Sequence, residues 1–455
     1  MNSPRINPGI SIAFLVGTTL VLTCLPSSGS AQEEPRKLEE IHAPGTATAT
    51  ATEDQSQPVM VLSLGECISL ALERQPALAA HRATLASAEA NYRALEDLRV
   101  PTFLVRDLPI RRKQASLGIT VAAAEVDQAQ YETVYAVTRT YMGVLYGRAQ
   151  KAEVVDKTID RLKATLEVAQ RHVQGASKYV TTRDVNKITI YLHLAENRRA
   201  EAERGIQRAL AALREAIGLE PGCCLQVPEE ALPQPQFTLC LGDLVALALS
   251  RRGELVQAAN SAQVTALEVC AQSKSCKPTM RTFASVVDIH ARNIPQGISN
   301  TDYRPGAVGL EMPTTLVGSR SARMERARDL NGRADAVVEK ARNLITLETE
   351  DAFYKWEESA KKVPTTKEAA GKALSLVDDI EKDFRGDVGV KVEDVFNDQV
   401  LWAQSQGQYN EALYQQVLAL AALERITAGG FSAGLVGQPI ATPPAAELPV
   451  PRTEP

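Results

Sequence analysis

Residues 62–78 read LSLGECISLALERQPAL, and residues 239–255 read LCLGDLVALALSRRGEL. Aligned from Leu62 and Leu239 without a gap, the two segments are identical at eight of their 17 positions. Two further positions hold residues of the same kind, Glu66 with Asp243 and Ile68 with Val245. So much agreement in a short window indicates that the chain is a tandem duplication.

The ends of the two copies also repeat. Asp184-Val185 and the segment LAAL at 210–213 return, at one common offset, as Asp394-Val395 and LAAL at 420–423. This offset is larger than that of the opening segments, so the copies begin and end alike but differ in length between. We assign residues 59–219 to a first repeat, 220–237 to a proline-rich linker, and 238–428 to a second repeat.

The composition favours long helices. Of the 455 residues, 44% are hydrophobic but only 5% are aromatic, and alanine and leucine are abundant. This is typical of long, thin helices with small residues along their seams. The net charge of −5 argues against a nucleic-acid partner, and the sequence has no basic stripe interleaved with aromatic residues.

Both repeats carry apolar residues at heptad spacing. In the first repeat these are Val155, Ile159, Leu162, Leu166, Ala169 and Val173. In the second they include Leu374, Val377, Phe384, Leu413, Val417 and Leu420. The pattern predicts a continuous helix over about 119–173, about 80 Å long at 1.5 Å per residue. Each repeat then turns back at Gly175 or at Gly386 and Gly389, which predicts a mainly α fold of long coiled-coil hairpins.

The N-terminus is typical of an export signal, and residues 1–31 are expected to be removed. Arg5 precedes an apolar run over 10–25, and a small-residue cleavage site ends at Ala31. Cys24 faintly resembles a lipidation site, but Thr23 is a poor residue before an acylated cysteine, so loss of Cys24 with the signal peptide is favoured.

Residues 32–58 and 429–455 hold too little apolar content to fold and are expected to be disordered. The mature chain also offers no run of the roughly 20 apolar residues that a spanning helix needs. Entry into a membrane would therefore require β-strands, which points to the periplasm and outer membrane of a diderm bacterium.

Alternation of polar and apolar residues predicts one pair of strands, over 279–316. The side chains expected to face lipid are Val287, Ile289, Val308, Leu310 and Met312. The alternative is an ordinary amphipathic hairpin packed on protein.

Six cysteines remain after removal of the signal peptide. Cys67 occupies the position of Leu244 in the other repeat, so we expect it to be a buried apolar residue. Cys270 and Cys276 could close a loop, but the sequence does not define the pairing. We expect no metal site and no cofactor. An enzyme finds no support, because the five histidines form no pair at metal spacing and no phosphate-binding loop or nucleophile elbow occurs.

The order of these features resembles the TolC-like outer-membrane efflux protein family. The features are the repeated opening helix, the strand pair, a re-entry into helix at Met312-Pro313 followed by Gly318, Arg320 and Ala327, a glycine-containing tip before Asp-Val, and an Ala-Leu-rich last helix. The resemblance spans 59–429. It implies a homotrimer in which each chain gives helices to a periplasmic α-barrel and strands to one shared β-barrel. It also implies a periplasmic adaptor protein and an inner-membrane transporter as partners.

The first repeat departs from the family pattern. Pro109 and Ala123 keep the same separation as Pro313 and Ala327, but only seven residues separate Pro101 from Pro109. Two membrane strands need about ten residues each. The first β-hairpin, within 99–118, is therefore missing or vestigial, and three chains would supply six strands, fewer than the roughly eight of the smallest known barrels.

The resemblance also implies a gate at the helical tips. The matching positions are Arg183, Asp184, Lys391, Glu393, Asp394 and Asn397. The alternative is that Asp184 and Asp394 cap helices and that the other charges are simply solvated. The leading functional hypothesis is an efflux channel subunit of the outer membrane, and the alternative is a non-conducting periplasmic scaffold.

Overall fold

A computed structural model describes residues 60–101, 105–175, 179–275, 316, 318–386 and 389–435. All of them belong to one compact unit that starts at Gln57. The predicted signal peptide, the segment 32–58 and the strand pair over 279–316 lie outside the described residues, apart from Leu316. The five side chains expected to face lipid therefore remain a prediction.

The described residues fold almost entirely as helices, which confirms the predicted fold class. The first repeat contains α1 (Leu64–Arg74), α2 (Pro76–Glu96), α3 (Leu108–Ala149), the π-helical turn η1 (Gln150–Asp156), α4 (Lys157–Gln174) and α5 (Thr182–Ile217). The second contains α6 (Leu241–Arg251), α7 (Gly253–Lys274), α8 (Arg320–Arg385) and α9 (Val392–Ile426). The short strands β1 (Met60–Val61) and β2 (Leu225–Gln226) pair in parallel.

The duplication read from the sequence is visible in the first two helices of each repeat. Both repeats break between these helices at the same place, since α2 begins at Pro76 and α7 begins at Gly253, its partner in the alignment of the two segments. The buried positions also correspond. Cys67 is 0% exposed where Leu244 is 3% exposed, which confirms the prediction for Cys67. Burial raises the pKa of the Cys67 thiol to about 12.

Each of these corners rests on the end of a long hairpin. In the first repeat the Gln75 amide donates to the carbonyls of Glu215 (3.2 Å) and Ala216 (3.0 Å) at the end of α5. A side chain at Gly218, which has φ +80°, would meet the Arg74 carbonyl at 3.0 Å. In the second repeat Gly430, just beyond α9, lies against the Arg251 side chain in the same way.

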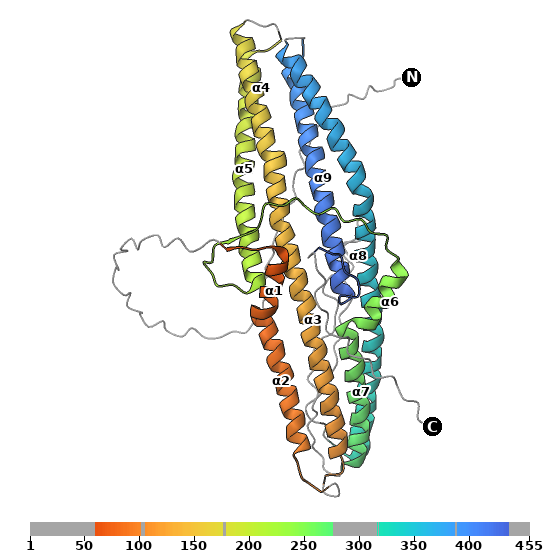
Figure 1. Ribbon diagram of the computed structural model, residues 1–455. Helices are drawn as coiled ribbons and strands as arrows, with labels where there is room; N and C mark the ends of the chain where they lie inside the picture. Colours follow the sequence, from red (N-terminus) through yellow and green to blue (C-terminus); the bar gives the residue numbers. More distant parts are fainter. Residues whose placement is uncertain are drawn as a thin grey trace, which may run out of the picture. The chain divides into compact units, whose positions relative to one another are not determined.

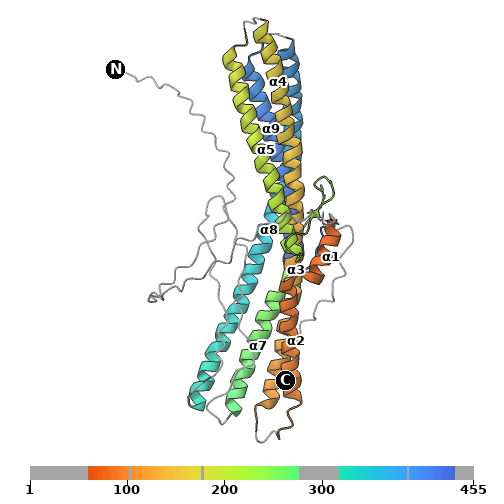
Figure 2. The ribbon, with the colours of Figure 1, turned by 90° about the vertical axis from the view of Figure 1, so that its left-hand side faces the viewer.

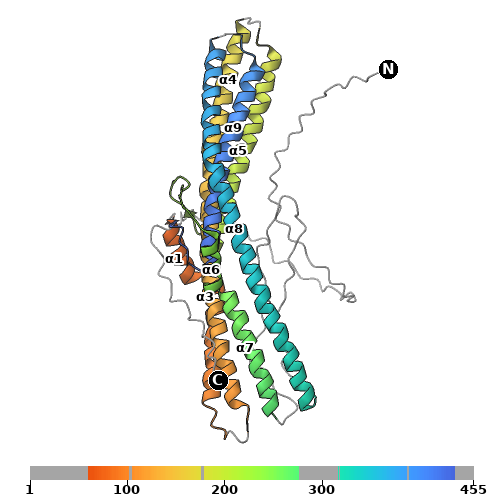
Figure 3. The ribbon, with the colours of Figure 1, turned by 90° about the vertical axis from the view of Figure 1, so that its right-hand side faces the viewer.

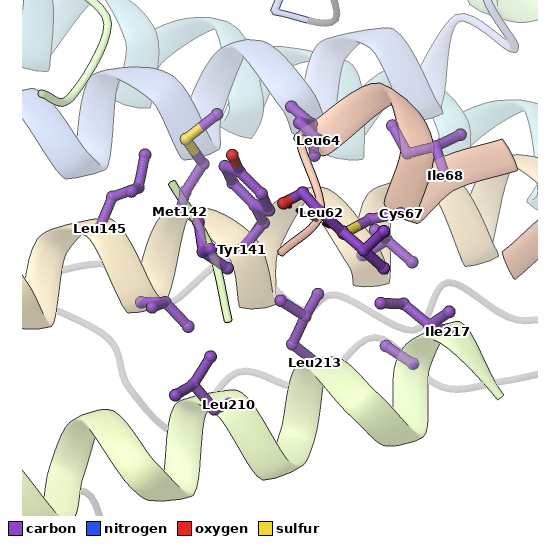
Figure 4. Close-up of a cluster of buried hydrophobic side chains, with 14 of the residues drawn as sticks. Leu62, Leu64, Cys67, Ile68, Tyr141, Met142, Leu145, Leu210, Leu213 and Ile217 are labelled. Carbon is purple, nitrogen blue, oxygen red and sulfur yellow. Dashed lines mark hydrogen bonds between the residues drawn. The ribbon is translucent and has the colours of Figure 1, made fainter. Parts of the chain in front are cut away.

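The central core joins the start of the first repeat to the long helices. Figure 4 shows Leu62, Leu64, Cys67 and Ile68 facing Tyr141 and Met142 of α3 and Leu213 and Ile217 of α5. Leu413 and Val417 of α9 complete the same cluster, as do Leu225, Val227 and Leu232 of the linker. The linker is thus extended, as expected, but its apolar side chains are anchored in the core.

The path from α3 through η1 to α4 is a continuous helical arm that contains one π-helical interruption, which confirms the predicted long helix (Figure 1). Its seam residues Ile159, Leu162 and Ala169 are buried. In the second repeat α8 is a single helix of 66 residues with Pro364 inside it. Figures 2 and 3 both show α8 changing direction between its two halves.

Alanines let α7 and α8 approach each other (Figure 3). Ala258 and Ala262 of α7 pack against Ala334, Val337 and Ala341 of α8. Ala327, Ala334 and Ala341 are all buried and recur at the heptad period of a coiled-coil seam. The composition predicted small residues along the helix seams, and alanines do form this seam.

The connection between α2 and α3 is short and tightly held. Arg112 on α3 donates to the carbonyls of Leu95, Glu96 and Leu98 at 2.9–3.1 Å, which satisfies the free carbonyls at the end of α2. The range 99–118 given to a vestigial hairpin was too long, because the chain is helical from Leu108 onward. Pro109 near the helix start is the physical reason, since proline is well suited to a first helical turn.

A buried polar cluster joins α3, α7 and α8 at this end. Arg111 pairs with Asp107 and Glu268, and the Gln272 amide donates to Glu268. Arg323 donates to Gln272 and to the Ser275 carbonyl. The cluster thus fixes the end of α7 and the start of α8, between which residues 275–319 connect the two helices.

The tail begins later than expected. Residues 429–435 pack on the bundle instead of leaving it: Phe431 contacts Phe237 with ring centroids 5.5 Å apart, and Ala433 is buried. The prediction of disorder from residue 429 was therefore wrong for 429–435, because Phe431 and Ala433 make apolar contacts with the bundle. Residues 436–455 lie outside the described residues.

Gly253 offers a test of the helix packing. A Cβ at this position would lie 2.7 Å from the Ala124 carbonyl oxygen of α3. We expect Gly253→Ala to destabilise the protein by about 1–3 kcal/mol, since neither backbone can move freely. Gly332→Ala in α8 is the matched control, because nothing lies within 4 Å of the new methyl group; it should stabilise by up to about 1 kcal/mol. Thermal unfolding followed by circular dichroism measures both, and a stabilising Gly253→Ala would contradict the packing.

Candidate functional site

The tips of the two long hairpins lie together at one end of the described unit, at the top of Figure 1. The first tip joins α4 to α5 and the second joins α8 to α9. Val180 and Ile188 from the first tip share a buried cluster with Phe384, Val392 and Val395 from the second. The six predicted gate residues all occur in the first turns of α5 and α9 or next to them.

Asp184 has a defined role at the start of α5. Its Oδ2 atom accepts hydrogen bonds from the Thr181 hydroxyl (2.7 Å) and the Thr181 backbone N–H (3.0 Å). The Thr181 hydroxyl, the Thr181 N–H, and the charges of Lys187 and Arg183 hold the pKa of the Asp184 carboxyl below its usual value. The capping alternative is therefore realised for Asp184. Arg183 is exposed beside it.

Asp394 occupies the matching place at the start of α9 but has a different environment. Lys391 is the N-cap residue, and its side chain makes no capping hydrogen bond. Among the described residues, no side-chain hydrogen bond or ion pair engages Glu393, Asp394 or Asn397, and all three are exposed. Burial and the nearby charge of Asp394 raise the pKa of Asp398. Among the described residues, the Asp394 carboxylate therefore has no hydrogen-bond or ion-pair partner, whereas the Asp184 carboxylate takes part in a helix cap.

Aromatic stacking holds the two hairpins together below the tips. His172 of α4 stacks on Phe384 of α8 with ring centroids 5.4 Å apart. Tyr191 of α5 stacks on Phe396 of α9 at 3.8 Å. A Cβ on Gly389 in the second tip would contact the Tyr179 ring of the first at 3.6 Å. Each helix of one hairpin is thereby fastened to a helix of the other.

A polar network continues this fastening farther from the tips. Arg161 of α4 bridges Asp378 (2.8 Å) and Glu381 (3.0 Å) of α8, and its guanidinium lies 4.9 Å from the Trp402 ring centroid. The buried Gln399 amide of α9 donates to Thr165 Oγ1 and Glu381 Oε1, both at 2.9 Å. Opening the tips would require these contacts to break.

Sequence reasoning found the tips but not the links between them. Arg183, Asp184, Lys391, Glu393, Asp394 and Asn397 are brought to one end, but among the described residues no ion pair joins the first two to the other four. The stacks and the Arg161 network were missed. In the sequence these residues are recognisable only as polar or aromatic residues next to heptad positions. Side chains at such places usually face solvent, so the sequence gives no reason to pair them.

Among the described residues, no group of three or more His, Cys, Asp or Glu side chains could hold a metal ion. A cavity of about 50 Å³ lies between α3, the corner of α6 and α7, and the end of α9. Since about 10–15 Å³ of such space is enough to hold one water molecule, this cavity has room for a few water molecules.

Comparison with known proteins identifies the fold. No model of a protein family and no curated protein matches the sequence. Among solved structures, the outer-membrane channel OprN aligns with 84% of this chain and 95% of its own, at 14% identity and a TM-score of 0.65. VceC of Vibrio cholerae aligns with 81% and 97% at 15% identity and 0.63, and the CmeC channel of Campylobacter jejuni with 87% and 95% at 10% identity and 0.64.

This chain has the TolC-like fold. The alignments cover 81–87% of this chain and nearly the whole of each channel chain, so the likeness includes both repeats. None of the helices in the described ranges has the length and apolar content needed to cross a membrane.

The capping role of Asp184 in this TolC-like tip predicts a pH dependence. Asp184→Ala should lower the free energy of unfolding at neutral pH by about 0.5–1 kcal/mol, the lower part of the range for caps because the site is open to water. Since the folded pKa is lowered, this stabilisation is present above the unfolded value of about 3.9 and is lost as pH falls through the folded value.

Denaturant unfolding of parent and variant between pH 7 and pH 2 measures this difference. Asp394→Ala is the control, because the equivalent carboxylate makes no capping hydrogen bond in the described residues. A difference for Asp184→Ala that stays constant over the whole pH range would contradict the capping role.

Proposed function

We propose that this protein is a subunit of an outer-membrane efflux channel, in which three copies form a periplasmic tunnel. The observation that carries this proposal is the TolC-like fold, shared with outer-membrane channels over more than four fifths of the chain. The export signal in the sequence supports a place in the cell envelope. The segment 279–316 is proposed to enter the outer membrane.

Exposed apolar side chains support the association of several copies. In the part of Figure 1 that bears the tips, α5 and α8 lie at the two sides, with α4 and α9 between them. Ile190 and Leu194 of α5 are 59% and 54% exposed, and Leu374 and Leu376 of α8 are 40% and 46% exposed.

These four side chains lie at matching heights. Ile190 and Leu194, four residues apart, share one face of α5, whereas Leu374 and Leu376, two residues apart, point to different sides of α8, so one of these two can meet a given neighbour. Ile190 and Leu194 lie about two to three turns after Thr182, the first residue of α5, and Leu376 and Leu374 lie about two to three turns before Arg385, the last residue of α8. All four are therefore roughly 12–18 Å from the tips at 1.5 Å per residue. The α5 edge of one copy can thus cover the α8 edge of the next, a head-to-tail contact that closes into a ring.

The gate at the tunnel mouth is proposed to depend chiefly on Asp394. Three-fold symmetry would bring three uncommitted Asp394 carboxylates together, and a ring of carboxylates favours cations over anions in a pore. Lys391 and Glu393 lie in the same turn and add charges of both signs. Arg183, Asp184 and Asn397 are proposed to border the mouth.

The proposed partners are a periplasmic adaptor and an inner-membrane transporter, which deliver the cargo. The outer surface of the helical hairpins is the part of the chain that reaches into the periplasm in this arrangement. The tunnel itself is not expected to select the cargo, because a passive duct makes few specific contacts with what passes through it.

A second candidate function is a non-conducting periplasmic scaffold. The observation that favours it is the short connection 97–107 between α2 and α3, held closed by Arg112. The first repeat thus lacks the chain length for two membrane strands of about ten residues each. Conductance separates the two candidates.

The functional test is the conductance of purified assemblies in planar lipid bilayers. We expect the parent protein to conduct and Asp394→Ala to conduct more, because the substitution removes charge and bulk from the proposed mouth. Glu339→Ala is the matched control: it removes the same charge from an exposed site on α8, far from the end of that helix at Arg385, and should leave conductance unchanged.

Unchanged conductance of Asp394→Ala in a folded assembly would defeat the gate assignment alone. A parent protein that assembles but does not conduct would defeat the channel proposal and favour the scaffold.

A further inference from the structure

Each repeat has one long helical arm, and each arm is interrupted once. In the first repeat the interruption is η1, and in the second it is Pro364. The interval from Glu153, in the middle of η1, to the arm's last residue Gln174 equals the interval from Pro364 to Arg385. A π-turn and a proline are both established causes of helix bending. Two different irregularities therefore occupy one place in the duplicated fold.

The backbone is weakened in a similar way at both places. Pro364 has no N–H, so the helical hydrogen bond to the Ala360 carbonyl is absent. The hydroxyls of Thr365 and Thr366 donate to the Lys362 carbonyl at 2.9 and 2.8 Å, a pattern that often bends helices. The Thr158 hydroxyl of α4 donates to the Val154 carbonyl of η1 at 2.6 Å. Figures 2 and 3 show that α8 changes direction along its length.

A band without buried residues crosses all four long helices near these interruptions. We call it the polar band, and it consists of residues 146–158 of the first arm, 193–209 of α5, 360–369 of α8 and 403–409 of α9. None of these residues is buried in the described unit. Leu145, Leu210 and Leu413 belong to the central core on one side, and Ile159, Leu192 and Trp402 to smaller clusters on the side of the tips. The apolar core is thus divided at the band.

Several contacts between helices inside the polar band are polar. The Gln150 amide donates to the Gly407 carbonyl (3.1 Å), and the Gln406 amide donates to Glu153 Oε2 (3.0 Å). Arg199 of α5 pairs with Asp156 at 3.2 Å. Half-exposed contacts of this kind contribute little to stability and can re-form after a small shift.

The four parts of the band lie at one level. Gln150 and Gln406 link η1 directly to α9. Val363, next to Pro364, packs against the same cluster as Tyr146 and Tyr409. The apolar side chains of the band lie at the edges of their clusters and none of them is buried, which is typical of a segment that opens readily.

We propose that the polar band is a hinge, about which the part bearing the tips moves relative to the central core. In this hinge η1 and Pro364 absorb the bend of the two arms, and α5 and α9 follow through the polar contacts. The hinge is a property of the single chain and does not depend on the proposed channel function.

Hydrogen–deuterium exchange of the purified full-length protein tests this hinge. In the parent protein we expect amides of the polar band to exchange about tenfold or more faster than those of the flanking segments 159–169 and 370–384. Pro364→Ala restores a backbone donor and should slow exchange in 360–369. Because the hinge is shared, the same substitution should also slow exchange in 150–156, on a different helix.

Gly371→Ala is the matched control. It also strengthens α8, nothing lies within 4 Å of the new methyl group, and it lies just outside the band. It should slow exchange only in its own turn. A band that exchanges as slowly as its flanks would overturn the hinge. So would a Pro364→Ala effect confined to α8, because the two interruptions would then be independent.

Discussion

The structure depends on covering very long apolar stripes from the side. No other helix in the described ranges is long enough to cover the apolar stripe of α8, which has 66 residues. The stripe must therefore be covered along its length by several helices. It is covered in two stages: α7 packs on its N-terminal half through the alanines, and α9 packs on its C-terminal half. The arm of α3, η1 and α4 is covered similarly, by α2 and α7 on one stretch and by α5 and α9 on the other. Ile190 and Leu194 of α5 and Leu374 and Leu376 of α8 remain exposed in the single chain. In the proposed assembly a neighbouring copy covers these edges.

Much of this arrangement could be predicted from the sequence, because periodicity records burial. The heptad series around Ile159 and Leu162 fixed the long arm, and the match of Cys67 with Leu244 fixed two equivalent buried positions. The tips followed from glycines before Asp-Val. η1 could not be predicted, since the spacing of Val144 and Val155 across it is one that an uninterrupted heptad seam also gives. The short pairing of β1 with β2 left no pattern, because two residues are too few to alternate.

The sequence predicted that the six candidate residues lie at the helical tips, but it did not predict the contacts that they make. Sequence alone treated Asp184 and Asp394 as equivalents, yet Thr181 converts the first into a cap, while the residue in the same position of the second repeat, Lys391, supplies no such contact. The stacking of Tyr191 on Phe396 joins residues from different repeats, and a single sequence does not reveal such a pairing. The repeats also differ at the opposite end, where Arg112 closes the short α2–α3 connection and the buried Arg111–Glu268 pair anchors the long one between α7 and α8.

The central claim is that the α5 edge of one copy covers the α8 edge of the next. It is tested most directly by crosslinking a chain that carries Ile190→Cys and Leu376→Cys with a short bismaleimide, using the single variants to correct for the native cysteines. Ile190→Cys with Lys361→Cys is the control, because Lys361 lies roughly 22 Å farther from the tip than Leu376 along the same helix. We predict crosslinked products of two and three chains for the first pair and only background for the second. Products that form equally from Ile190→Cys alone, or a chain that stays monomeric with both sites reacted, would contradict the claim.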